Sequence, residues 1–210
     1  MKIIALLVSL LPVLLFPQNG VSISVPAKFE PDQGVYLGAF IANDPVVSGN
    51  PTAFETLTGK KHTGYLNYAF WGNPFPAWAQ QYANAGAAIQ IGFEPDNGLQ
   101  EVTDGEYIRA WAKKARELNV PIFLRFASEM NGNWTAWHGD PALYKEKFRL
   151  VSTIMKEEAP NVAMVWCPNN IPHDTLNPAI NIHNYYPGDE YVDWVGIDFY
   201  MVFLSSGQPD

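Results

Sequence analysis

Short apolar runs alternate with helix-like segments along most of the chain. Runs rich in β-branched and aromatic residues between turn signals predict strands, and apolar residues at helical spacing predict helices. Strands that alternate with helices imply a parallel sheet. The predicted strands cover residues 34–40, 65–71, 87–93, 120–124, 162–167 and 192–200, and the fourth of them is an apolar run that leads to Glu129. The predicted helices cover residues 54–58, 77–85, 104–118 and 141–158.

The side-chain pattern of these strands separates a closed barrel from a doubly wound sheet. Residues two apart in a strand face the same side, and both faces of a doubly wound sheet should be apolar because both meet helices. Here one face of several strands becomes polar towards its carboxyl end, with the sets Gln90, Gly92, Glu94; Phe123, Arg125, Ala127, Glu129; and Gly196, Asp198, Tyr200. We therefore expect an α/β fold of the (β/α)8 TIM barrel type, whose interior opens into a site at that end, with the doubly wound sheet as the alternative.

The segment that follows the fourth predicted strand combines a carboxylate with amides and indoles. It reads RFASEMNGNWTAWHG over residues 125–139. Amides bond hydroxyl groups in two directions, and indole faces cover the apolar faces of sugar rings. A strand that ends in Glu129, beside Asn131, Trp134 and Trp137, therefore favours a sugar site, and the alternative is a polar strand end with tryptophans that only pack.

The motif Glu-Met-Asn-Gly at 129–132, followed by tryptophans and preceded by Arg125 on the strand, resembles glycoside hydrolase family 26. Residues 165–169 and 191–200 match the same pattern, so that the resemblance runs from about Gly34 to Tyr200. The family contains mostly endo-β-mannanases and belongs to the clan of retaining (β/α)8-barrel glycosidases. It usually has histidine before the catalytic glutamate, whereas this chain has Ser128, which affects the expected activity and substrate preference.

The resemblance implies catalytic roles for residues at three strand ends. Retaining enzymes use two carboxyl groups about 5 Å apart, one as acid/base and one as nucleophile. Glu129 would be the acid/base, and the nucleophile would lie at the end of a seventh strand. Tyr200 would lie near that nucleophile, and Arg125 would pair with a carboxylate, either the nucleophile or a purely structural partner. Asp198 is expected to cap or orient a neighbour.

The other candidate substrate-binding residues follow from their places at strand ends. Glu94 ends the third predicted strand, and Trp166 ends the fifth, where it is expected to floor a sugar subsite. Asn131, Trp134 and Trp137 complete the set. The nearby asparagines at 169 and 170 are expected to shape a turn.

The sixth predicted strand ends shortly before the last residue, Asp210. A (β/α)8 barrel needs eight strand–helix units and typically about 250 residues. We therefore expect an incomplete barrel with about six of the eight units, a nucleophile outside these 210 residues, and no activity from the 210 residues alone.

The first residues resemble a signal peptide. Lys2 precedes a leucine-rich run that is too short to span a bilayer,. The predicted organisation is a signal peptide at 1–24, cleaved after Ser24 or Ala27, followed by a partial catalytic barrel at 25–210. This predicts a secreted or periplasmic protein with no stable membrane association after cleavage, and an uncleaved anchor is the alternative.

Charge and residue usage exclude several other functions. The net charge is −8 without basic clusters, which disfavours nucleic acid and anionic membranes as partners. The single cysteine, Cys167, is expected to be a buried structural thiol, and no cofactor or metal is predicted because no ligand spacing typical of zinc or calcium is present. The histidines considered were His62, His138, His173 and His183.

Two hypotheses from different classes follow. The first is a secreted endo-acting β-glycanase, with β-1,4-mannan as the first substrate, that cleaves β-linked polysaccharide by a retaining double displacement. The second is a non-catalytic carbohydrate-binding barrel or an inactive fragment of a glycosidase. Hydrolysis of mannan, glucan or xylan distinguishes the two.

Overall fold

The computed structural model describes residues 26–170 and 177–200. Within them, six parallel strands form one sheet in the order β1-β2-β3-β4-β5-β6, without a reversal of strand order. This uninterrupted order, with helices on one side only, is that of an incomplete (β/α)8 barrel with six of its strands, as predicted. The strands are β1 (Gly38–Phe40), β2 (Gly64–Phe70), β3 (Ala88–Glu94), β4 (Ile122–Phe126), β5 (Val162–Trp166) and β6 (Trp194–Val195).

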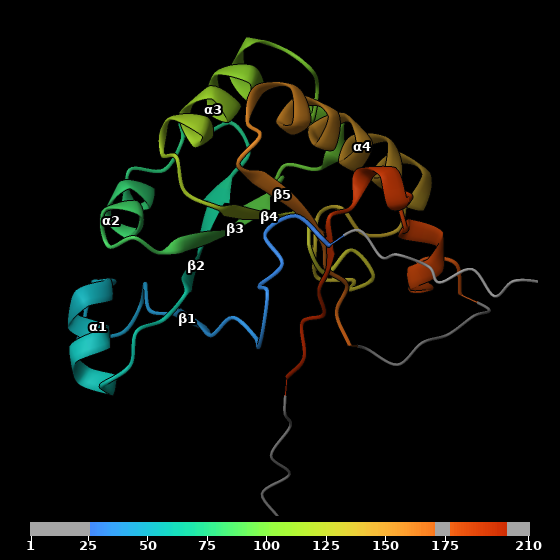
Figure 1. Ribbon diagram of the computed structural model, residues 1–210. Helices are drawn as coiled ribbons and strands as arrows, with labels where there is room; N and C mark the ends of the chain where they lie inside the picture. The colour runs from blue at the N-terminus through green and yellow to red at the C-terminus, as the bar shows by residue number, and fades with distance from the viewer. Residues whose placement is uncertain (1–25, 171–176, 201–210) are drawn as a thin grey trace, which may run out of the picture.

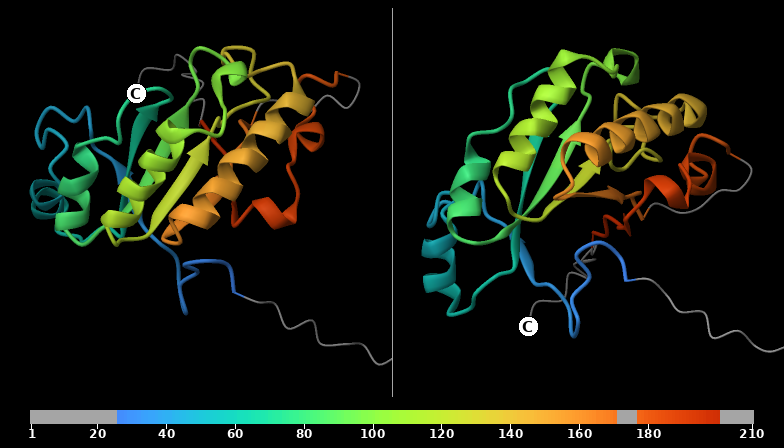
Figure 2. Two further views of the ribbon diagram at one scale, coloured as in Figure 1. Left: turned by 90° about the horizontal axis from the view of Figure 1, so that it is seen from above. Right: turned by 45° about the horizontal axis from the view of Figure 1, so that its top comes forward.

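The helices form an arc around the outer side of the curved sheet (Figures 1 and 2). Both views of Figure 2 place α2, α3 and α4 over the same face of the strands. The opposite face is concave and becomes the inside of the barrel. The α-helices are α1 (Pro51–Thr58), α2 (Trp78–Asn84), α3 (Glu106–Glu117) and α4 (Pro141–Glu158), and the short 3-10 helices are η1 (Leu99–Glu101), η2 (Ile182–Tyr185) and η3 (Asp189–Tyr191).

The two faces of the sheet carry different side chains because of the strand register. On β3, Ile89, Ile91 and Phe93 are fully buried against the helices. The residues between them face the barrel interior, where Gly92 lies in register with Tyr68 on one side and Arg125 on the other. The predicted alternation on this strand is confirmed, and it directs the charged residues into the interior.

Helix α4 has the bounds that the sequence predicts. The Asp140 side chain accepts a hydrogen bond of 3.0 Å from the backbone N–H of Leu143, and Pro141 fits the first helical turn, where no N–H is needed,. The apolar side includes Phe148, Val151 and Met155, all fully buried. Burial of each such side chain contributes about 1.5–3 kcal/mol, which holds α4 against β4 and β5.

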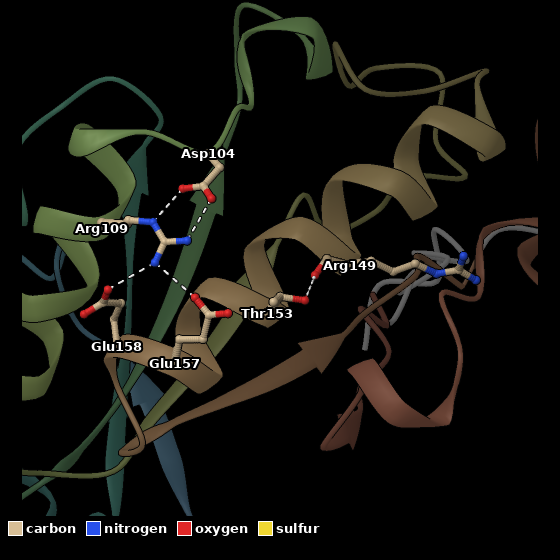
Figure 3. Close-up of polar contacts among 6 residues, drawn as sticks. All are labelled: Asp104, Arg109, Arg149, Thr153, Glu157 and Glu158. Atoms are coloured by element: carbon tan, nitrogen blue, oxygen red, sulfur yellow. Dashed lines mark hydrogen bonds and ion pairs between the residues drawn. The ribbon is translucent and has the colours of Figure 1, made fainter.

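Asp104 does not cap α3, contrary to the sequence-based expectation. The cap residue is Gly105, and the Asp104 carboxylate instead accepts hydrogen bonds of 2.7 and 2.8 Å from Arg109. The same guanidinium donates to Glu157 at 3.0 Å and to Glu158 at 3.1 Å in α4 (Figure 3). Arg109 thus links α3 to α4 at the surface, where solvent screens each ion pair and keeps its contribution small.

The strands at the two ends of the sheet are shorter than predicted. The first strand begins at Gly38 rather than residue 34, and the sixth contains only Trp194 and Val195. An isolated bridge between Asn169 and Asp198 continues the pairing beyond β6. Outward-facing Val195, Ile197 and Phe199 are 62–65% exposed, so this edge leaves apolar surface uncovered.

No helix in the described part of the chain is both long and apolar enough to cross a membrane. The predicted signal peptide at residues 1–24 lies outside the described residues.

Candidate active site

A cleft of about 350 Å³ opens at the carboxyl ends of the strands. Tyr68, Glu94 and Arg125 reach it from β2, β3 and β4, and Asp198 and Tyr200 reach it from the segment after β6. A larger opening of about 480 Å³ lies at the other end of the barrel and is lined mainly by apolar and aromatic side chains, without a carboxylate. The smaller cleft is therefore the one with groups that can transfer protons.

Glu129 reaches this cleft because the chain turns sharply after β4. Strand β4 ends at Phe126, and Ala127 and Glu129 then adopt left-handed φ angles of 47° and 57°. The predicted strand alternation therefore stops before Glu129. A non-glycine residue in this conformation costs about 1–2 kcal/mol, and such strain is concentrated at functional sites. The Glu129 backbone N–H donates to the Cys167 carbonyl at 2.8 Å and anchors the turn to the end of β5.

Hydrogen bonds reach both carboxylate oxygens of Glu129. The Trp134 indole N–H donates to Oε2 at 2.7 Å, and the Asn169 amide donates to Oε1 at 3.0 Å. The Tyr200 hydroxyl lies 3.3 Å from Oε1 and donates to it. The three donors come from three different segments, so the position of the carboxyl group depends on how β4, β5 and β6 are packed together.

A buried ion pair forms the floor of the cleft. Arg125, only 5% exposed, donates to the Asp198 carboxylate. Asp198, expected to cap or orient a neighbour, thus contacts Arg125. Burial raises the pKa of Asp198, although the Arg125 guanidinium opposes this shift. The buried Arg125 Nε has no hydrogen-bond partner among the described residues, so the guanidinium keeps one N–H donor that could bond a second carboxylate.

Cys167 lies beside this ion pair. Its Sγ is 3.6 Å from Oδ1 of Asp198 and acts as a weak donor. Burial raises the pKa of the thiol to about 12, so the group stays protonated and is a poor nucleophile. This agrees with the prediction of a buried structural thiol.

Residues 94–208 match the model of glycosyl hydrolase family 26. The chain belongs to this family. The resemblance predicted from residues 129–132 and their surroundings is thereby confirmed.

Two relatives of this family 26 chain are similar to it over about four fifths of its length. Endoglucanase H of Acetivibrio thermocellus is 28% identical over 80% of the chain, and a β-1,3-xylanase of Vibrio sp. is 26% identical over 84%. The chain spans only 20% and 40% of these relatives. Among solved structures, the family 26 β-mannanase of Bacteroides ovatus superposes with a TM-score of 0.58 at 16% identity, over 81% of this chain and 63% of that one. This last similarity concerns the fold alone.

Trp134, which was predicted to be a sugar platform, lines the cleft. Its side chain is 56% exposed beside the cleft. The indole lies so close to Gly132 that a Cβ atom there would be 2.3 Å from its Cζ2 atom. Glycine in the family 26 motif therefore lets Trp134 lie against the turn and reach Glu129.

The other two tryptophans that were predicted to bind sugar, Trp137 and Trp166, are buried. Trp137 is 6% exposed, lines the cleft and donates from Nε1 to the Ser128 carbonyl at 2.8 Å. Trp166 is also 6% exposed but packs edge-to-face on Tyr186 at 5.1 Å. Trp166 belongs to the outer core and does not line the cleft, because its place in β5 directs the side chain towards the helices. The prediction that Trp166 forms the floor of a sugar subsite is therefore wrong.

Asn131 does not contact the cleft either. It is fully buried, and its side chain bonds the backbone of Asn169. Asn169, expected only to shape a turn, instead contacts Glu129 directly. Tyr68 was not predicted but lines the cleft; its inward alternation with Leu66 on β2 is the sequence signal that could have found it.

No group of three or more His, Cys, Asp or Glu side chains in the described residues is arranged to hold a metal ion.

Glu94 is the second carboxyl group with unusual surroundings. It ends β3 inside the cleft, where its backbone carbonyl accepts a hydrogen bond of 2.8 Å from the Trp71 N–H. Its carboxyl group forms no hydrogen bond or ion pair with the described residues. Burial, together with the charges of Asp96, Glu129 and Asp198, raises the pKa of Glu94 to about 7, and Arg125 opposes the shift. Near neutral pH this carboxyl group can therefore donate as well as accept hydrogen bonds.

We expect Glu94→Gln to raise Tm at pH 8 but not at pH 4. The unfolded pKa of a glutamate is about 4.3, below the folded pKa of about 7. The folded protein therefore holds the proton more tightly, and stability is lost as the pH rises from about 4.3 through 7. Glutamine removes this loss. Thermal unfolding at both pH values tests the prediction, and an equal change in Tm at pH 4 and pH 8 would contradict it.

Proposed function

We propose that the chain provides the acid/base part of the active site of a secreted, endo-acting β-glycanase. The observation that carries this proposal is the Glu129 carboxyl group, held by Trp134 and Asn169 at the mouth of a family 26 barrel. The nucleophile is proposed to be a glutamate at the end of a seventh strand, outside the described residues.

The proposed reaction is a double displacement with retention. Protonated Glu129 gives its proton to the glycosidic oxygen as the nucleophile attacks the anomeric carbon and the leaving sugar departs. The Glu129 carboxylate then takes a proton from water, which attacks the same carbon and releases the nucleophile. The unpartnered Nε of Arg125 supports a further role, because it can bind the nucleophile carboxylate and favour its ionised form,. Tyr200, whose hydroxyl bonds Glu129, is proposed to bond the nucleophile as well.

The proposed first substrate is β-1,4-mannan, which is the expectation from the family resemblance. Two observations favour a β-glucan or a β-1,3-xylan as the second candidate. Ser128 stands where histidine is usual, and the two relatives that align with most of the chain are named an endoglucanase and a β-1,3-xylanase.

Reducing-sugar release from mannan, β-glucan and β-1,3-xylan by the full-length protein tests whether it is a hydrolase and which polysaccharide it cleaves. Hydrolysis of one backbone with a mixture of oligosaccharides supports an endo-acting enzyme and identifies the substrate. Binding of oligosaccharides without any hydrolysis would support the carbohydrate-binding alternative.

Export predicts that the mature protein begins just after Ser24 or Ala27, which sequencing of its N-terminus checks.

We expect Trp134→Ala to weaken oligosaccharide binding about fivefold, since aromatic contacts are worth about 1 kcal/mol. Calorimetry in a Glu129→Gln background avoids hydrolysis during the measurement. Trp134→Phe keeps an aromatic face but removes the N–H donor to Glu129, so it should retain most of the binding. Trp78→Ala, on the outer helix α2, is the control and should leave the affinity unchanged. Equal affinity in Trp134→Ala and the parent would mean that the indole does not contact sugar.

A further inference from the structure

The Asn131 side chain continues the pairing of β4 with β5 beyond the end of β4. The register between these strands ends with Arg125 opposite Val165. Further along, the Asn131 amide donates to the Asn169 carbonyl at 2.9 Å and accepts from the Asn169 backbone N–H at 2.9 Å. This two-way bond is what a neighbouring strand would offer, and it fixes the backbone of Asn169.

Asn169 in turn carries one of the donors that hold Glu129. Its side-chain amide donates to Oε1 of Glu129 at 3.0 Å. Because Asn131 is fully buried and both polar atoms of its amide bond Asn169, Asn131 reaches the site only through Asn169. We propose that Asn131 is a positioning residue for Glu129, acting through Asn169; this rests on the proposed role of Glu129 as the acid/base.

A second buried bond stabilises the same turn from its other side. The Trp137 indole donates to the Ser128 carbonyl, immediately before Glu129. The backbone of Glu129 is therefore fixed independently of Asn131. Loss of Asn131 should consequently move the Asn169 amide away from the Glu129 carboxyl group without displacing the turn itself.

The test uses Asn131→Ala, Asn169→Ala and the double variant in the full-length protein. Misplacement of a catalytic group by about 1 Å can cost up to about 100-fold in rate, so we expect Asn131→Ala to lower kcat on polysaccharide about 10- to 100-fold with little change in KM. In the Asn169→Ala background, adding Asn131→Ala should cause almost no further loss. Independent, multiplicative losses in the double variant would overturn the proposal, as would unchanged kcat in Asn131→Ala.

Asn161 provides a matched control at the other end of β5. Its side-chain amide likewise bonds only backbone groups among the described residues, since it donates to the carbonyls of Ala115 and Val120, both at 2.9 Å. Asn161→Ala should therefore lower Tm while leaving kcat unchanged, and its effects should be independent of Asn169→Ala. If Asn131→Ala does not fold, Asn131→Asp replaces it, because aspartate keeps the acceptor for the Asn169 N–H. The kcat of Asn131→Asp should fall less than that of Asn169→Ala. A kcat equal to that of the parent would again overturn the proposal.

A crystal structure separates failure of this proposal from failure of the proposed function. If the parent hydrolyses no β-glycan, the proposed function fails without reference to Asn131. The positioning role is then decided by the distance between the Asn169 amide and Glu129 Oε1. In an Asn131 variant this distance should exceed about 3.5 Å, beyond which no hydrogen bond forms. An unchanged distance would overturn the positioning role.

Discussion

Glu129→Gln in the full-length protein should lower polysaccharide turnover about 100- to 10,000-fold, the range expected for loss of general acid–base catalysis. Glutamine keeps the size of the side chain but cannot give a proton to a leaving alkoxide. The glycosylation step with an activated aryl glycoside should be much less affected, because its leaving group departs without protonation. Rates of both reactions, measured for parent and variant, test this expectation.

The control is Glu117→Gln, since Glu117 lies on the exposed outer surface of α3 and pairs only with Lys114. It should leave both rates unchanged. Near-normal polysaccharide hydrolysis by Glu129→Gln would contradict the assignment of Glu129 as the acid. An equally large loss with the activated aryl glycoside would point to a general loss of the active-site structure.

Asp198→Asn removes a carboxylate whose charge burial disfavours, but it also leaves the buried Arg125 guanidinium without a counter-charge. The second effect is the larger, so we expect the free energy of unfolding to fall by about 3–5 kcal/mol. The two side chains are 6% and 18% exposed, so water replaces little of the lost partner. Adding Arg125→Met should recover much of the loss, because a buried pair replaced as a whole is often tolerated. Urea unfolding of both single variants and the double variant measures the coupling.

The exposed pair Lys114 and Glu117 is the control for this experiment. Their side chains are 61% and 58% exposed, and Lys114→Met should produce no measurable change because solvent-exposed pairs contribute little. Additive losses from Arg125→Met and Asp198→Asn would show that the two groups do not stabilise each other.

Local signals made α4 and the order of the sheet predictable. Asp140 and Pro141 mark the helix start, and the apolar spacing of Phe148, Val151 and Met155 identifies its buried side. Likewise, alternation along β3 identified Glu94 as inward-facing. These features depend on side chains a few residues apart, which the sequence displays directly.

The turn after β4 could not be predicted in the same way. Ala127 and Glu129 have left-handed φ angles although neither is glycine, and the surrounding contacts hold them there rather than any local preference. The backbone bond from Glu129 to Cys167 and the side-chain bonds from Asn131 to Asn169 each connect residues 38 positions apart. The burial of Asn131 depends on this long-range pairing, so its residue type alone suggested a substrate contact.

The residues of the candidate site were likewise predictable only in part from local sequence signals. Alternation placed Arg125 and Asp198 on inward faces, but only the curvature of the sheet between β4 and the segment after β6 brings them together across 73 positions of sequence. Trp134 and Trp166 looked equivalent because one follows a predicted strand closely and the other lies at the end of one. The structure separates them, since Trp134 lies on a loop above the cleft and Trp166 packs on the helix side of the sheet.

The central claim, that Glu129 is the acid/base of a retaining enzyme, is tested most directly by azide rescue. In Glu129→Ala, an aryl β-glycoside with a good leaving group should form the glycosyl–enzyme intermediate, which then persists because no base activates water. Azide needs no base, can enter the space left by the carboxyl group, and should attack the intermediate from the face that water uses. The predicted result is faster turnover with azide and a β-glycosyl azide product of retained configuration. An α-glycosyl azide, or turnover that azide does not change, would contradict the claim.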